Sequence, residues 1–169
     1  MNKEVLFNAG GNIGVSRSQI NVFKEKSGLN KRKRIRLCTH EDIKDKLHEM
    51  LIVHTNNAYI RPHKHLKKAE SLHVIEGSAD LILFDDRGNI KSVIRLGDYL
   101  SGNKFYFRIS VSDFHMLLLR SKFVVFHETT SGPFKKSANM ASEWSPAEED
   151  VKAVKEYMNR ISMEVNAKI

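Results

Sequence analysis

Residues 62–77 read PHKHLKKAESLHVIEG. Side chains alternate between the two faces of a strand, so His63 and His65 project to the same side and can present two imidazole nitrogens to one ion. After a short loop, Glu70 opens the next strand and adds a carboxylate oxygen, and Gly77 makes the following turn. The spacing therefore predicts part of a metal site inside a β structure.

A fourth ligand is expected from a later apolar run, residues 114–119 (FHMLLL). His115 shares a face with two of the leucines, and a histidine among buried leucines requires a polar partner, which a metal would provide. Three imidazoles and one carboxylate suit Fe(II), Mn(II), Co(II), Ni(II) or Zn(II), because mixed nitrogen and oxygen ligands are intermediate in hardness. The expected cofactor is one divalent transition metal. The alternative is that His63 and His65 are surface residues and His115 is a hydrogen-bonded core histidine.

The region from Glu49 to Phe126 consists of short β-rich runs separated by turn residues, which is typical of a sandwich or barrel. The runs are 50–53, 58–60, 71–75, 79–84, 90–96, 105–109, 114–119 and 123–126. The turns at 76–78 and 85–89 contain residues that tolerate positive φ, so the strands flanking each turn are expected to pair antiparallel. The predicted fold class is mostly β, with a barrel core over about residues 48–134.

Helices are expected at both ends of the barrel. Residues 18–26 predict a short helix, and the basic run 31–36 (KRKRIR) is interpreted as a lead-in outside the core. Residues 145–148 (SPAE) have an N-cap serine, a proline at the first helical position and a capping-box glutamate. The apolar stripe that follows predicts a helix over 146–166, packed on the barrel or on a partner subunit. Residues 1–169 are expected to form one domain.

Composition narrows the classes of function. The chain has 169 residues, of which 41% are hydrophobic and 28% charged, as in ordinary folded proteins. Apolar runs such as 123–126 are far too short for a membrane helix. The single cysteine, Cys38, cannot form an internal disulfide, and the first residues lack the apolar core of a secretory signal, so a cytoplasmic location is expected. The formal charge of +8 favours an anionic partner.

The order His-x-His-x4-Glu-x6-Gly, a Gly-Asp turn at 97–98 and a later strand histidine match the pattern of the cupin superfamily. Within it the sequence resembles the WbuC family of cupin-fold metalloproteins, which are associated with bacterial surface-polysaccharide gene clusters. The segments that carry this resemblance are 34–40, 48–52, 59–65, 84–88, 128–134 and 141–149. The resemblance covers about residues 32–150 and implies a jelly-roll barrel (double-stranded β-helix) with one metal. It also implies a role in polysaccharide biosynthesis.

Five further residues are candidates for the pocket. Arg34, Arg36 and Arg61 could bind a phosphate or carboxylate of a substrate, because guanidinium groups bind such anions bidentately. Glu128 lies at the end of a strand in an apolar barrel. Burial there would raise the pKa of its carboxyl group, so that it could act as a general base; the alternative is a structural ion pair with an arginine. His40 is the second candidate catalytic residue.

Three functions fit these features. The first is a metal-dependent isomerase or epimerase that acts on an activated, anionic sugar such as a nucleotide-sugar. The second is an Fe(II) dioxygenase-type cupin, and the third is a non-catalytic cupin that binds or senses a small ligand. Nucleic-acid binding is disfavoured because the basic run has no interleaved aromatic residues and no recognition helix follows it. A homodimer is expected by analogy, through edge strands or the last helix.

Overall fold

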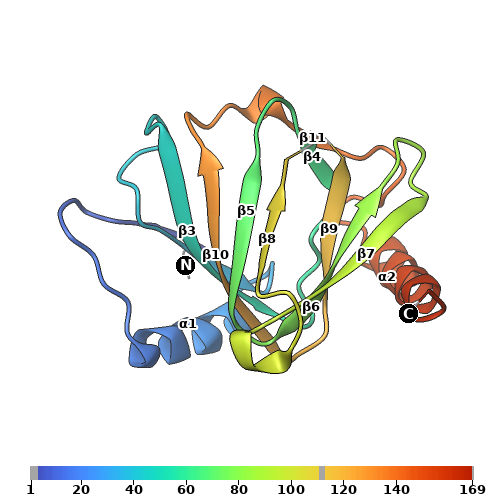
Figure 1. Ribbon diagram of the computed structural model, residues 1–169, viewed down its shortest axis with the longest axis horizontal. Coiled ribbons are helices and arrows are strands. Elements are labelled where there is room, and N and C mark those ends of the chain that lie inside the picture. The colour runs from blue at the N-terminus through green and yellow to red at the C-terminus, as the bar shows by residue number, and fades with distance from the viewer. Residues whose placement is uncertain (1–3, 111–112, 169) are drawn as a thin grey trace.

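The computed structural model describes residues 4–110 and 113–168. Two β-sheets face each other, and the two helices lie on opposite sides of the molecule (Figure 1). In chain order the helices and strands are β1 (Val5–Phe7), α1 (Arg17–Leu29), β2 (Arg34–Cys38), β3 (Leu47–Thr55), β4 (His63–His65), β5 (Glu70–Glu76), β6 (Ser78–Phe84), β7 (Ile90–Gly97), β8 (Tyr106–Ile109), β9 (Phe114–Leu119), β10 (Phe123–Ser131), β11 (Asn139–Ala141) and α2 (Val151–Asn166). Short 3-10 turns at Tyr99–Ser101 and Lys136–Ala138 complete the structure.

The strands are arranged as a jelly roll. One sheet has the order β1-β2-β3-β10-β5-β8 and the other has the order β11-β4-β9-β6-β7. Eight of these strands, β3 to β10, form the two facing four-stranded halves of the barrel, and the chain passes repeatedly from one half to the other. The predicted cupin fold, mostly β with a helix at each end, is confirmed.

The barrel interior is filled by alternate residues of facing strands. Inward-facing side chains include Met50 and Ile52 of β3, Leu72 of β5, and Leu117 and Leu119 of β9, all of them buried in one cluster. The last two share their face with the histidine of β9, as the period-two pattern predicts. The polar residues of the candidate site therefore project into an apolar interior.

The outer face of the second sheet is covered by α2, whose Tyr157, Ile161 and Val165 are buried against β6 and β9. The predicted packing of this helix on the barrel is confirmed, but its predicted start at 146 is wrong. The helix begins at Val151, because the Asp150 side chain accepts a hydrogen bond from the Ala153 N–H and caps it. No described helix is long and apolar enough to cross a membrane.

The contact between α2 and the barrel predicts a stability effect at Ile161, which is 0% exposed. Ile161→Ala should lower the free energy of unfolding by about 2–5 kcal/mol, because it deletes buried methyl groups and leaves a cavity. The measurement is urea denaturation followed by circular dichroism. Met163→Ala on the same helix is the control, since Met163 is 74% exposed and its loss should change stability by less than about 0.5 kcal/mol. Equal effects of the two variants would contradict this packing.

The second half of the basic run, residues 34–36, is part of the sheet, contrary to the prediction that the whole run is a lead-in outside the core. Residues 34–38 form β2, which pairs antiparallel with β3, and Ile35, Leu37 and Cys38 are buried. The strand alternates, so arginines share one face and the aliphatic residues share the other. The predicted strand at 58–60 is also wrong, because these residues connect β3 to β4 without joining a sheet.

The two predicted turns behave differently. Residues 85–89 join β6 and β7 in an antiparallel hairpin, as predicted, with Gly88 at φ +88°. At Gly77 the chain instead leaves the first sheet and enters the second, so β5 and β6 do not pair. Gly77 has φ +84°, and a Cβ there would lie 2.2 Å from the Phe123 carbonyl oxygen. A glycine is required at this crossing because both the backbone conformation and the available space exclude a side chain.

Candidate metal centre

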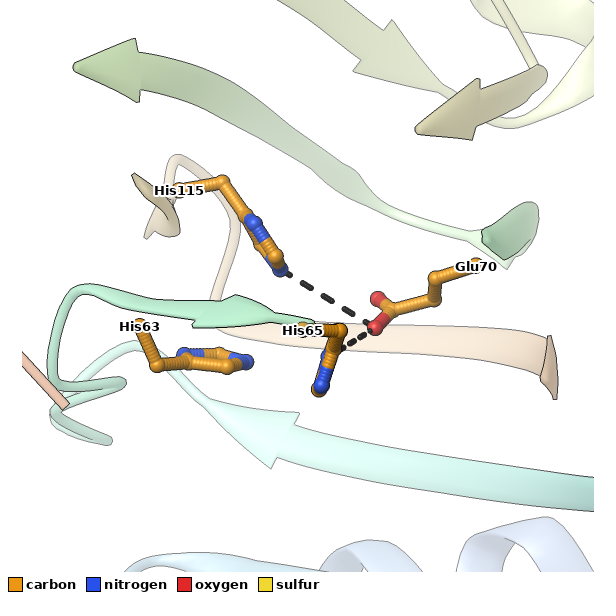
Figure 2. Close-up of side chains that lie close together, drawn as sticks. All are labelled: His63, His65, Glu70 and His115. Atoms are coloured by element: carbon orange, nitrogen blue, oxygen red, sulfur yellow. Dashed lines mark ion pairs between the residues drawn. The ribbon is translucent and has the colours of Figure 1, made fainter. Parts of the chain in front are cut away.

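Four side chains with metal-ligating atoms converge inside one end of the barrel (Figure 2). They are those predicted from the sequence: His63 and His65 of β4, Glu70 of β5 and His115 of β9. One ligand atom from each lies within 4.8 Å of the others. Cross-strand pairing of His63 with His115 aligns two of the imidazoles, and their ring centroids are 4.5 Å apart. The group is suited to bind one metal ion.

Each imidazole is oriented by a hydrogen bond from its Nδ1 atom. His63 Nδ1 donates to the Arg61 carbonyl oxygen at 2.9 Å, and His115 Nδ1 donates to the Asp113 carbonyl oxygen at 3.0 Å. His65 Nδ1 lies 2.5 Å from the Asn139 side-chain oxygen. An oxygen acceptor at Nδ1 fixes the proton there, so Nε2 is left to carry the lone pair that a metal requires.

The charges of the group match what a metal ligand set needs. Burial lowers the pKa of His63 to about 3 and also lowers the pKa of His115, so both rings are neutral at neutral pH. Burial alone would raise the pKa of Glu70, but its hydrogen bond with His65 and the neighbouring imidazoles lower that pKa to about 2. The carboxylate is therefore ionised. Metal binding requires neutral imidazoles and a charged carboxylate, and His63, His115 and Glu70 meet this requirement.

Two contacts of Glu70, with His65 and His115, indicate that a cation would fit between these side chains. The His65 Nε2 atom lies 2.6 Å from Glu70 Oε2. Burial lowers the pKa of His65, but the hydrogen bond and charge of Glu70, together with the hydrogen bond of Asn139, outweigh burial and raise that pKa. A metal at this position would replace the shared proton. His115 Nε2 is buried, lies 3.9 Å from the same oxygen and makes no hydrogen bond within 4–110 and 113–168. A buried nitrogen without a hydrogen bond is costly, and coordination would satisfy it.

Asn139 was not predicted from the sequence. It lies on β11, opposite His65, and its side-chain oxygen orients that imidazole. Asn139→Ala should lower metal affinity by about 10–100-fold, the usual effect of losing a group that orients a ligand. Competition with a chromophoric chelator measures the affinity. Asn89→Ala, in the hairpin between β6 and β7, is a control that should bind metal as tightly as the wild type. An unchanged affinity in Asn139→Ala would show that β4 alone orients the ring.

The predicted catalytic candidate Glu128 lies on the inner face of the barrel. Its cross-strand neighbours are Met50 and Leu72, and Leu72 is two residues from Glu70. Burial, followed by the charge of Glu70, raises the pKa of Glu128 to about 7. The predicted rise in this pKa is confirmed. A carboxyl group with such a pKa can exchange a proton near neutral pH.

The side chains of three other predicted site residues, His40, Arg34 and Arg61, make hydrogen bonds or ion pairs with residues outside the four-residue ligand group. His40 stacks on His48 with ring centroids 4.1 Å apart and accepts a hydrogen bond from the Glu49 N–H; no described contact joins it to the four ligand residues. Arg34 Nε lies 2.5 Å from Glu4 Oε1. Arg61 donates to the Ser142 and Ser145 carbonyl oxygens, which anchors the segment after β11. The roles of these three residues in binding or catalysis stay predictions.

A separate hollow is present on the outer face of the second sheet, between Asp80, Arg95 and Arg120. Asp80 is buried there and pairs with Arg120, with 2.5 Å between Oδ2 and Nε. None of the four ligand residues lines this hollow. It is therefore distinct from the candidate metal centre.

Comparisons with known proteins found one family model and several similar solved structures. A family model described as a domain of unknown function (DUF6016) matches residues 15–96, which include three of the four ligand residues. No curated protein matches the sequence. A conserved protein with a double-stranded β-helix domain from Klebsiella pneumoniae is similar in structure, with a TM-score of 0.49 and 14% identity over 65% of this chain and 84% of that chain.

Two further solved structures are similar over shorter stretches. A protein from Shewanella oneidensis has a TM-score of 0.48 and 12% identity over 58% of this chain and 63% of that one. The cupin domain of Schizosaccharomyces pombe Cnp3 has a TM-score of 0.46 and 10% identity, over 60% and 66%. The chain thus spans less than two thirds of the length of these two structures. The cupin fold itself is assigned from the strand order of this protein.

Proposed function

We propose that this protein is a cupin metalloprotein that binds one divalent transition metal and acts on a small anionic sugar derivative. The observation that carries the proposal is the convergence of His63, His65, Glu70 and His115, with their ligand atoms within 4.8 Å of one another. The net charge of +8 supports an anionic substrate. The resemblance to the WbuC family supports a sugar of bacterial surface-polysaccharide biosynthesis, and a nucleotide-sugar is the first compound to test.

The residues of the barrel have separate tasks in this proposal. The three imidazoles and the Glu70 carboxylate hold the ion, which when bound polarises a carbonyl or hydroxyl oxygen of the substrate. Glu128, whose pKa is raised to about 7 by burial, takes or returns a proton at a carbon or oxygen next to the polarised group. The apolar residues around these groups exclude water. This combination suits an isomerase or epimerase.

Metal content tests the first half of the proposal. Protein purified without an affinity tag should contain close to one transition-metal ion per chain by elemental analysis, and His63→Ala and Glu70→Ala should contain almost none. His73→Ala is the matched control, because His73 is on β5 but exposed on the outer face, where its ring packs near Phe105. A wild-type protein without metal after metal-replete growth would refute the proposal.

Metal identity and substrate binding test the second half. Calorimetric titration of the metal-loaded protein with a uridine diphosphate sugar should show one site per chain. If the metal is iron and the protein consumes O2 with a small organic substrate, the dioxygenase alternative is correct instead. Tight binding of the sugar without any turnover would indicate a ligand-binding cupin.

A further inference from the structure

Two arginines on β2 are two residues apart on one face but differ in their partners. Arg34 pairs with Glu4, with 2.5 Å between Nε and Oε1. Arg36 makes no ion pair and no side-chain hydrogen bond to any residue that the structure describes, and its Nε atom is buried. Withdrawing part of a guanidinium from water without an acceptor is costly. Arg36 thus has donor capacity that no described protein group uses.

The sheet register shows where Arg36 lies. It is opposite Ile52 of β3, which is opposite Phe126 of β10, which in turn is opposite Val74 of β5. Directly opposite residues share a face of the sheet. The last three residues are buried in the barrel core. Arg36 therefore lies in a row of inward-facing side chains, between Ile52 of β3 and Val5 of β1, on the side of the barrel where the first sheet extends through β2 and β1.

The neighbouring rows lead from Arg36 toward the candidate metal centre. The next row contains Cys38, Met50, Glu128 and Leu72, and the row after it contains Glu70. Glu128 is close enough to Arg36 on one side, and to Glu70 on the other, for both charges to affect its pKa. The inner face of the sheet thus presents, in order, the Arg36 guanidinium, the Glu128 carboxyl group and Glu70, the one metal-ligand residue on this sheet.

The chemistry of a guanidinium defines what it would bind. Its planar fork of N–H donors matches two oxygens of a carboxylate or a phosphate. We propose that Arg36 binds the anionic group, a carboxylate or a phosphate, of a small substrate whose other oxygens extend past Glu128 toward the four ligand residues. This inference rests on the proposed function and names the substrate group that the barrel recognises.

Calorimetric titration with two anions tests the inference. The probes are inorganic phosphate and malonate, which separate the phosphate from the carboxylate, and each is titrated into metal-loaded and chelator-treated protein. One of them should bind the wild type at one site per chain, and Arg36→Gln should weaken that binding at least about 10-fold. Arg36→Lys keeps the charge without the planar fork and should show an intermediate loss. The metal content of both variants should equal that of the wild type.

Arg108→Gln is the matched control, since it removes the same charge from the exposed face of β8 in the same sheet. Its anion affinity should equal that of the wild type. The inference is overturned if Arg108→Gln weakens binding as much as Arg36→Gln does. It is also overturned if both Arg36 variants bind as tightly as the wild type, or if neither probe binds the wild type. If the wild type takes up no metal but still binds an anion in an Arg36-dependent way, the anion site is upheld and the metal proposal is refuted. If Arg36→Gln does not fold, Arg36→Lys decides.

Discussion

Glu70→Gln should reduce the affinity of the barrel for a divalent transition metal by at least about 100-fold, because it removes the one negative charge of the ligand group. Glutamine has the same size as glutamate, so the apolar surroundings of this buried residue should be kept. The variant also loses the hydrogen bond that His65 makes to Glu70 Oε2 at 2.6 Å. Competition titrations with Mn²⁺ and Co²⁺ in the presence of a calibrated chelator measure the affinity.

The control for this variant is Glu76→Gln on the same strand. Glu76 is exposed and pairs with Lys24 outside the barrel, so its neutralisation should leave metal affinity within about twofold of the wild type. A Glu70→Gln protein that binds metal nearly as well as Glu76→Gln would mean that three imidazoles suffice. The carboxylate would then have another role, such as proton transfer.

Gly77→Ala should lower the free energy of unfolding by about 3–4 kcal/mol, a large part of the stability of an ordinary domain. About 1–2 kcal/mol comes from placing alanine at φ +84°, and the rest comes from the approach of its Cβ to the Phe123 carbonyl oxygen and the Ser121 hydroxyl, at 2.2 and 2.4 Å. Urea denaturation measures the loss. The crossing between the two sheets would have to move to relieve these contacts.

Gly102→Ala separates the two causes. Gly102 also has a positive φ, +75°, but a Cβ there would meet no atom within 4 Å. This variant should lose only the conformational part, about 1–2 kcal/mol. If both variants lose the same amount, backbone conformation alone accounts for the glycine at 77, and the close contact with β10 is relieved at little cost.

Much of the metal centre could be predicted from the sequence because its geometry is local. Two imidazoles separated by one residue must share a face of a strand, and His115 follows from the same alternation in an apolar run. Asn139 could not be found in this way. It reaches His65 through pairing of β11 with β4, across more than seventy residues, and β11 has only three residues and no apolar alternation.

The errors in the fold have physical causes as well. Residues 34–38 alternate between cationic and apolar side chains, as a strand with two different faces does. From the sequence the arginines indicate a solvated segment, because arginines are not expected on the inner face of a strand. The helix start at 145–148 has the right residue types, but its serine is used elsewhere. The Ser145 hydroxyl accepts a hydrogen bond from Arg61 Nε at 3.2 Å and lies 2.5 Å from the Ser142 hydroxyl. Tertiary contacts thus override a local helix signal.

The ligand group draws on both sheets, since Glu70 comes from β5 of the first and the three histidines come from β4 and β9 of the second. An ion held by all four residues would cross-link the two halves of the barrel. Any opening fluctuation that separates the halves would then have to break coordination, so its free energy would rise with metal concentration. Amide hydrogens of β5 and β9, far apart in the chain, would be expected to slow their exchange together when metal is added.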